Sequence, residues 1–191
     1  MSEKSILRVK NYLIETISKA ESDPYGVVEH VEIVERWAKF ILKNHPEADK
    51  EITLISVWLH DIGHYPLDDQ DHAQVGEKIA LTFLRSINFP KEKIQKIAHC
   101  VRAHRCRDVQ PQTIEAKIVA CADSASHFID YAYTDMMVRN KKLPEKKSVI
   151  EKLERDYRDI SLFPEVKSKL EKLYLAWKML IPEFEKINEE I

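Results

Sequence analysis

Apolar residues recur every three or four positions along most of the chain, which is the periodicity of amphipathic helices. The first two predicted helices lie at about residues 3–21 and from Val27 to the stop at Asn44-His45-Pro46. The second helix ends there because the residue before a proline is biased away from the helical region. Four further helices are predicted at about 50–62, 72–87, 91–104 and 113–130. This pattern predicts an all-α protein.

The segment at about 50–62 is apolar nearly all round, which is typical of a central, enclosed helix. Gly63 follows it and indicates a helix stop or a close approach of two backbones. A lysine-rich segment from Tyr131 to Lys147 leads to two amphipathic helices separated by Pro164. With only 3 glycines the chain has few of the turn signals that a sheet-rich fold needs. Since no repeat or long linker is present, residues 1–191 are predicted to form one domain of seven or eight helices.

Composition restricts the class of partner. With 30 basic and 32 acidic residues the formal net charge is −2, so the positive field that nonspecific nucleic-acid binding needs is missing. This net charge is compatible with a small anionic substrate, which needs only a local basic patch. The 3 cysteines form no CxxC pair and are predicted to be reduced thiols. The N-terminus lacks the apolar region of a signal peptide and no run of 18 apolar residues occurs, so a cytoplasmic protein without a membrane span is expected.

Candidate chemistry centres on His60-Asp61, near the end of the apolar run from Ile52 to Ile62. A carboxylate in such a segment is costly unless a positive group lies beside it. His30 faces the core side of the second helix, and Asp123 lies in a helix of small apolar residues. Each alone would usually be a hydrogen-bonded or ion-paired core residue. Together they offer nitrogen and oxygen donors from three separated segments, which is the donor set of a divalent metal centre.

The same residues carry a family resemblance. The H…HD…D signature of the HD-domain phosphohydrolase superfamily resembles three parts of this chain: His30, the segment Leu59-His60-Asp61-Ile62-Gly63, and Ala122-Asp123. The likeness extends to three more segments, at residues 71–80, 98–104 and 113–119. In total it covers about residues 26–130. The resemblance implies a helical, metal-dependent hydrolase of phosphate esters or anhydrides, commonly of nucleotides. Residues after about 131 would form a C-terminal helical extension.

Site roles follow from the resemblance residue by residue. It implies that the principal metal is held by four ligands, His30, His60, Asp61 and Asp123. His72 and His104 match positions that bind a second metal or contact the phosphate in part of the family, and Asp61 would then bridge the two ions. Imidazole and carboxylate donors favour Mn, Fe, Co, Ni or Zn over Mg.

Other residues lie near this constellation in chain order. Arg105, between Arg102 and Arg107, can bind phosphate oxygens through its guanidinium group. Arg105 is therefore assigned to catalysis together with Asp61, His72 and His104, although runs of charge are usually solvated surface. His64 could reach the rim of the site. His127, four residues after Asp123, could orient that carboxylate, but a plain structural role is the simpler interpretation.

The leading functional hypothesis is a metal-dependent phosphohydrolase that uses a metal-activated water. Its substrate would be a phosphomonoester or phosphoanhydride, of a nucleotide or another small phosphorylated metabolite. One alternative is a non-catalytic HD module that binds metal for regulation or stability. The other is a helical protein whose histidines and aspartates satisfy one another without any metal. Exposed apolar residues expected on the C-terminal helices also favour a homodimer.

Overall fold

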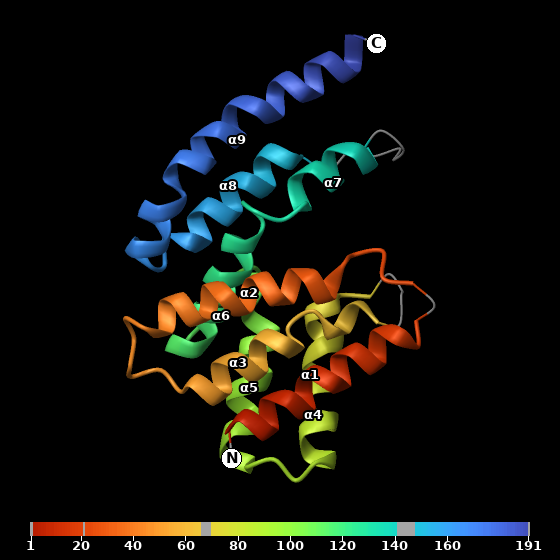
Figure 1. Cartoon of the computed structure of the whole chain (residues 1–191), viewed down its shortest axis with the longest axis vertical. Helices are drawn as coiled ribbons and strands as arrows, with labels where there is room; N and C mark the ends of the chain where they lie inside the picture. Colours follow the sequence, from red (N-terminus) through yellow and green to blue (C-terminus); the bar gives the residue numbers. More distant parts are fainter. Residues whose placement is uncertain (1, 21, 66–69, 141–147, 191) are drawn as a thin grey trace. The chain divides into compact units, whose positions relative to one another are not determined.

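The computed structural model describes residues 2–20, 22–65, 70–140 and 148–190 (Figure 1). Within these ranges the chain is entirely helical, with no strand, so the all-α prediction is confirmed. The described part contains one 3₁₀ helix, η1 (Ile62–His64), and nine α-helices: α1 (Ser2–Ser18), α2 (Val27–Leu42), α3 (Lys50–Leu59), α4 (His72–Ser86), α5 (Lys91–Ala103), α6 (Ile114–Ser126), α7 (Ala132–Asn140), α8 (Val149–Ile160) and α9 (Pro164–Glu190). No helix among the described residues is long and apolar enough to cross a membrane.

Contacts divide the chain into two compact units, Met1–Asp123 and Ser124–Ile191, and the boundary falls inside α6. One more α-helix is present than the sequence pattern predicts. It is α7, which occupies part of the lysine-rich segment where no helix was predicted. The rest of that segment, 141–147, lies outside the described residues.

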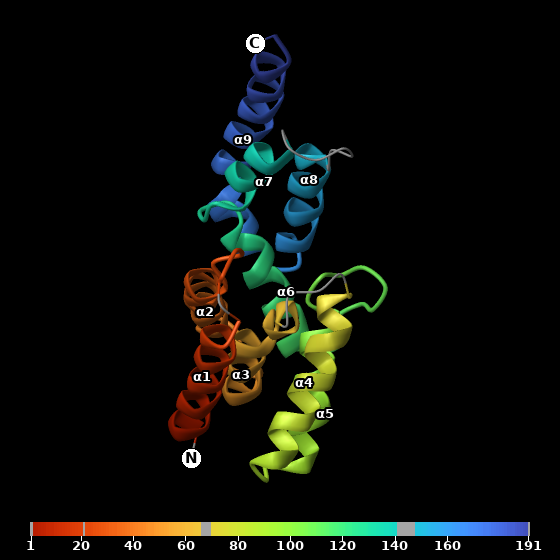
Figure 2. The same ribbon diagram turned by 90° about the vertical axis from the view of Figure 1, so that its right-hand side faces the viewer.

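The N-terminal unit is built around α3, as the apolar pattern predicts. Every residue from Ile52 to Leu59 is buried, and α3 contacts α1, α2 and α5. The second layer is the pair α4 and α5, which lie side by side in Figure 2, and α4 also contacts η1. Because α3 is enclosed by its neighbours, the residues that follow its last turn are held in the interior of this unit.

Helix starts are defined by side-chain caps. Asp49 accepts hydrogen bonds from two N–H groups at the start of α3, and Asp71 does the same for α4. Such caps satisfy amide groups that have no partner within the helix and contribute about 1 kcal/mol each. The cap at Asp71 fixes where α4 begins, and the first residue of that helix is His72.

The C-terminal unit is held together by a buried carboxylate. Asp156 on α8 is 5% exposed. It accepts a hydrogen bond from Tyr133 on α7 at 2.9 Å and pairs with Lys152 at 3.1 Å and His127 at 3.2 Å. Burial raises the pKa of Asp156, but the nearby His127 and Lys152 outweigh it and hold that pKa below its ordinary value. Three segments of this unit therefore depend on one ionised side chain.

Replacing Asp156 with asparagine is expected to lower the free energy of unfolding by about 3 kcal/mol, because it leaves Lys152 without its buried partner. Since the folded pKa of Asp156 is depressed, its contribution is present above the pKa of an unfolded aspartate and is lost as the pH falls through the folded value. Denaturant unfolding followed by circular dichroism measures the change. The matched control is Asp135→Asn, which breaks an exposed pair with Arg139 and should cost less than about 1 kcal/mol. Equal effects of the two substitutions would contradict the role given to Asp156.

Candidate metal centre

The end of α3 presents two ligands in sequence order. His60 directly follows the helix and Asp61 precedes η1, with φ −104° and ψ 6°. This backbone conformation lies in the sparsely populated bridge region, where many active-site residues are found. The predicted helix over 50–62 is therefore wrong at its last residues, since α3 stops at Leu59 and the chain turns. The turn directs His60 and Asp61 into a common site with side chains from other helices.

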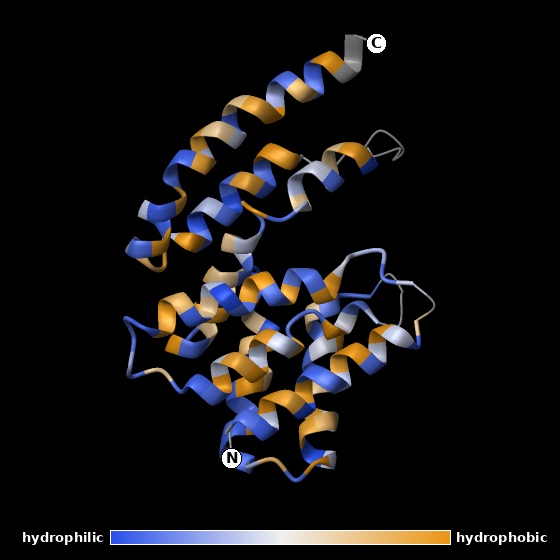
Figure 3. Ribbon diagram, viewed as in Figure 1, coloured by the Kyte–Doolittle hydropathy of each residue, from blue (hydrophilic) through white to orange (hydrophobic). Residues whose placement is uncertain are grey.

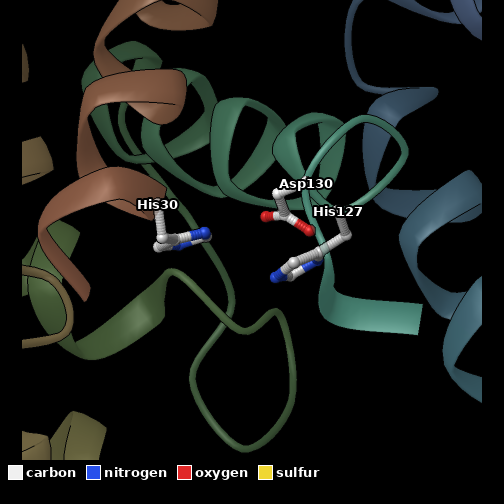
Figure 4. A group of neighbouring side chains, drawn as sticks. All are labelled: His30, His127 and Asp130. Atoms are coloured by element: carbon white, nitrogen blue, oxygen red, sulfur yellow. The ribbon is translucent and has the colours of Figure 1, made fainter. Parts of the chain in front are cut away.

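The first cluster contains His30, His60 and Asp123. His30 projects from α2 (Figure 4), and its Nε2 atom lies 3.3 Å from Nε2 of His60. Oδ1 of Asp123 is 3.2 Å from Nε2 of His30 and 3.7 Å from Nε2 of His60. All three residues are at least nine-tenths buried. The structure therefore brings these three predicted ligand residues together in the N-terminal unit.

A second cluster contains Asp61, His72 and His104. Nε2 of His72 lies 3.3 Å from Nε2 of His104, and each of these atoms is 3.6 Å from Oδ1 of Asp61. His64 stands next to it, with Nε2 3.8 Å from the same oxygen and its ring stacked on that of His72 at 4.1 Å. The structure thus places His72 and His104 beside Asp61, as the resemblance implied.

Asp61 joins the two clusters through its two carboxylate oxygens. Oδ1 faces the second cluster, whereas Oδ2 faces the first, at 3.6 Å from Nε2 of His30 and 3.4 Å from Nε2 of His60. A carboxylate whose oxygens face different imidazole pairs has the arrangement of a bridging ligand. The resemblance implied this role for Asp61 if two ions bind, and the distances are compatible with it.

Two of the imidazoles are fixed in one tautomer by the backbone. Nδ1 of His60 lies 2.7 Å from the carbonyl oxygen of Val57, and Nδ1 of His104 lies 2.7 Å from that of Val101. A carbonyl can only accept, so each Nδ1 must carry the hydrogen and donate. Each neutral ring then directs the lone pair of Nε2 into the site, which is how metal-ligating histidines are usually oriented.

The spacing of these donors fits a metal ion. With a metal–nitrogen bond of about 2.1 Å, two ligand atoms on one ion lie about 3.0–3.4 Å apart. Nε2 atoms of His30 and His60 are 3.3 Å apart, as are those of His72 and His104. Two nitrogen lone pairs at such a distance repel each other unless a cation or a proton lies between them. Both clusters therefore have the donor set and spacing of divalent metal sites.

The approach of α4 to this site requires glycine at position 63. A Cβ atom there would lie 1.9 Å from the backbone oxygen of His72 and 2.5 Å from the backbone nitrogen of Gly76. Because both contacts are with backbone atoms, no side-chain movement could relieve them. Gly63 and Gly76 thus allow η1 and α4 to touch, which brings His72 to Asp61. The predicted close backbone approach at Gly63 is confirmed.

Burial and charge set the protonation of the site. Burial penalises the charged imidazole and lowers the pKa of His72 to about 3 and that of His104 to about 4. Burial also disfavours the ionised form of Asp61, but the surrounding imidazoles outweigh it and hold the pKa of Asp61 below its usual range. The pKa of His60 shifts in the other direction. Burial lowers it, but the carboxylates of Asp61 and Asp123 outweigh burial and raise it overall. Protonation of Nε2 of His60 therefore competes with metal binding at this position.

Metal affinity of the first cluster is expected to fall as the pH drops below neutrality, because the proton on His60 must leave before Nε2 can bind metal. The raised pKa of His60 places this competition above the ordinary value for histidine. Each pH unit below that pKa should weaken binding about tenfold for one displaced proton. Isothermal titration of chelator-treated protein with a divalent metal at several pH values measures the effect. An affinity that does not vary from about pH 5.5 to pH 8 would contradict the assignment of His60 as a ligand.

Arg105 is held at the edge of the second cluster by Asp71. Its Nη2 donates to Oδ2 of Asp71, the residue whose other oxygen caps the start of α4. After burial, the charge of Arg105 is one of the smaller causes that lower the pKa of His72. Sequence reasoning named Arg105 but did not find Asp71 as its anchor. The signal was available, since an aspartate one position before a helix start is typical of a cap.

The remaining candidates have structural contacts. Arg102 pairs with Asp108. His127 and Asp130 follow α6 in the C-terminal unit (Figure 4), where His127 contacts Asp156 and Lys152. These contacts agree with the simpler, structural interpretation of His127.

Comparison with known proteins agrees with this geometry. A family model described as "HD domain" matches residues 27–126, more than half of the chain, and the protein therefore belongs to the HD domain family. No curated protein matches. The fold resembles the crystal structure of a predicted HD superfamily hydrolase from an uncultured Thermotogales bacterium, with 21% identity and a TM-score of 0.57 over 89% of this chain and 91% of the other. It also resembles a Lactobacillus plantarum protein, with 14% identity and a TM-score of 0.69 over 100% of both chains.

HD domains bind divalent metals, and the two clusters are where this chain could hold them. Membership in the family also indicates a hydrolase of the HD type.

Proposed function

We propose that the protein is a metal-dependent phosphohydrolase that cleaves a phosphomonoester or phosphoanhydride. The observation that carries the proposal is the carboxylate of Asp61, whose two oxygens face two separate pairs of imidazoles. An inward-facing group of six nitrogen and oxygen donors is more than a helical core needs for its own stability, because each buried polar group costs free energy unless it is paired. A nucleotide or another small phosphorylated metabolite is the proposed substrate.

The principal ion would be held by His30, His60, Asp61 and Asp123, and a second by Asp61, His72 and His104. A divalent metal at these ligands would lower the pKa of bound water towards neutrality and would thereby supply a nucleophile for attack on phosphorus. The mixture of imidazole and carboxylate donors favours Mn, Fe, Co, Ni or Zn over Mg.

The chain's own residues would orient the ligand imidazoles and neutralise negative charge on the substrate. The backbone carbonyls of Val57 and Val101 fix the rings of His60 and His104, so these ligands need no reorganisation. Arg105 supplies a fixed positive charge beside His72, where it can bind phosphoryl oxygens that gain negative charge during the reaction. Its buried Nε–H has no hydrogen-bond partner in the part of the chain that the structure describes, and a substrate oxygen would relieve that cost.

The proposal is tested by elemental analysis of the purified protein together with a panel of nucleotides and other phosphoesters. We expect bound transition metal and release of phosphate or pyrophosphate from a subset of the panel, abolished by chelator and restored by the metal found. Metal without turnover of any substrate would instead indicate the non-catalytic module. Absence of metal binding would indicate that the histidines and aspartates only satisfy one another.

Arg105→Ala is expected to reduce kcat/KM about 100-fold while metal content stays unchanged, because the guanidinium stabilises charge on the substrate and is not a ligand. Steady-state kinetics and elemental analysis of the same sample measure both quantities. Arg107→Ala is the matched control, since this neighbouring arginine is exposed. If both variants keep wild-type kinetics, Arg105 has no part in the reaction.

A further inference from the structure

Helix α9 carries apolar side chains on two faces, only one of which is buried. The inner face is covered by contacts with α7 and α8 and contains Val166, Leu170, Tyr174 and Ile181. The ring of Tyr174 stacks on Tyr157 of α8 at 3.7 Å. These residues are four, four and seven positions apart, which places them on one face of a helix that packs on the rest of its unit.

The second face is exposed and unusually apolar. Seven of the ten exposed residues between positions 173 and 187 are apolar, whereas the exposed residues of α8 are all charged: Glu151, Glu154 and Arg158. Figure 3 shows the apolar residues as orange bands along α9. Met179 is 75% exposed and Leu180 51%. We call the exposed apolar residues Leu173, Leu175, Ala176, Met179, Leu180, Pro182 and Ile187 the α9 seam.

The spacing within the α9 seam is that of a helix-pairing surface. Leu173, Leu180 and Ile187 are seven residues apart, and Ala176 lies three positions after Leu173, whereas the exposed Glu183 lies three positions after Leu180. An apolar repeat of seven with a further apolar residue after three positions is the pattern by which two helices pack along a common seam. A contiguous exposed apolar surface of this kind marks an interaction site more often than ordinary surface.

The charges of α9 indicate which partner fits. Residues 166–178 contain four lysines and one glutamate, whereas residues 179–190 contain four glutamates and one lysine. The positive and negative halves meet beside Leu180, in the middle of the seam. An antiparallel pair of two such helices therefore places each positive half against the negative half of the other, while a parallel pair would place like charges together.

We propose that the α9 seam binds a second copy of this chain, with the two α9 helices antiparallel. The seam and its charges are self-complementary, which is what a two-fold symmetric dimer requires because the same surface serves both subunits. A foreign partner would need no such symmetry of charge. The dimer removes the apolar residues of both seams from water.

The proposal is tested by sedimentation and light scattering of the full chain over a range of concentrations. We expect a mass twice the 22.4 kDa of one chain. Leu180→Glu should weaken dimerisation at least about tenfold, because it buries a charge at the centre of the interface. Leu7→Glu is the matched control, since Leu7 is an exposed leucine of α1, at 57%, and should leave the dimer intact. Circular dichroism shows that both variants are folded.

Charge exchange tests the antiparallel arrangement. The double substitutions Lys169→Glu/Lys172→Glu and Glu183→Lys/Glu185→Lys should each weaken the dimer at least about tenfold, because each gives both halves the same sign of charge. Their combination restores opposite signs and should return the affinity to within about threefold of the wild type. A monomeric wild-type protein at about 100 μM, or a Leu180→Glu variant as dimeric as the wild type, would overturn the proposal. Failure of the combined variant to recover would overturn the antiparallel arrangement.

Discussion

Replacing Asp61 with alanine is expected to remove metal from both clusters at once and to reduce phosphohydrolase activity by more than about 100-fold. A loss of up to about 100-fold is already common when the residue removed only hydrogen-bonds to a metal ligand. Asp61 has a larger role, because Oδ2 faces His30 and His60 while Oδ1 faces His72 and His104. Without it the second cluster keeps two imidazoles but no carboxylate, and the first cluster keeps only the carboxylate of Asp123 to offset the charge of an ion.

The matched comparison is Asp123→Ala, which removes a carboxylate from the first cluster only. We expect this variant to keep the metal affinity of the second cluster while it loses that of the first. Elemental analysis gives the metal content of each protein, and titration with metal gives the number and strength of the remaining sites. Equal metal content in Asp61→Ala and the wild type would show that Asp61 is not a ligand. Identical losses in the two variants would show that the clusters do not bind independently.

Much of the N-terminal unit could be predicted because local patterns and global packing agree. The apolar run of α3 predicts a central helix, and Ile52 to Leu59 are indeed all buried. The candidate ligands could be identified because ionisable side chains are costly in apolar segments, and a shared metal would offset that cost for His30, His60 and Asp123. Their chain separation carries no geometric information, so the distances among them had to come from the structure.

Other features could not be predicted because they depend on contacts between distant backbones. Nothing in the sequence indicates that the carbonyl oxygens of Val57 and Val101 orient two ligands, since that role depends on where each helix ends. The helix α7 was not predicted because its nine residues are too few for a clear apolar period. The contact of Gly76 with Gly63 was not predicted either. A lone glycine in a helix usually indicates only a weaker helix, and its contact with Gly63 is visible only in three dimensions.

That contact leads to the second large expected effect, for Gly63→Ala. The added methyl group would lie 1.9 Å from the backbone oxygen of His72, so η1 and α4 must separate. We expect the free energy of unfolding to fall by about 3 kcal/mol, the upper part of the range for overpacked interiors. Since α4 carries His72, its displacement should also remove metal binding at the second cluster, while the first cluster keeps its candidate ligands on α2, just after α3 and on α6.

Gly76→Ala is the matched control for this prediction, because it adds the same methyl group to the other side of the contact. Its Cβ would lie 3.2 Å from Cγ1 of Val101 and 3.5 Å from the backbone of Gly63 and His60, distances that small side-chain movements can accommodate. We expect a loss of about 1 kcal/mol or less and unchanged metal binding. Denaturant unfolding and metal titration of both variants distinguish the two glycines. If Gly63→Ala has the stability and metal content of the wild type, the close approach of η1 and α4 is not what brings His72 to Asp61.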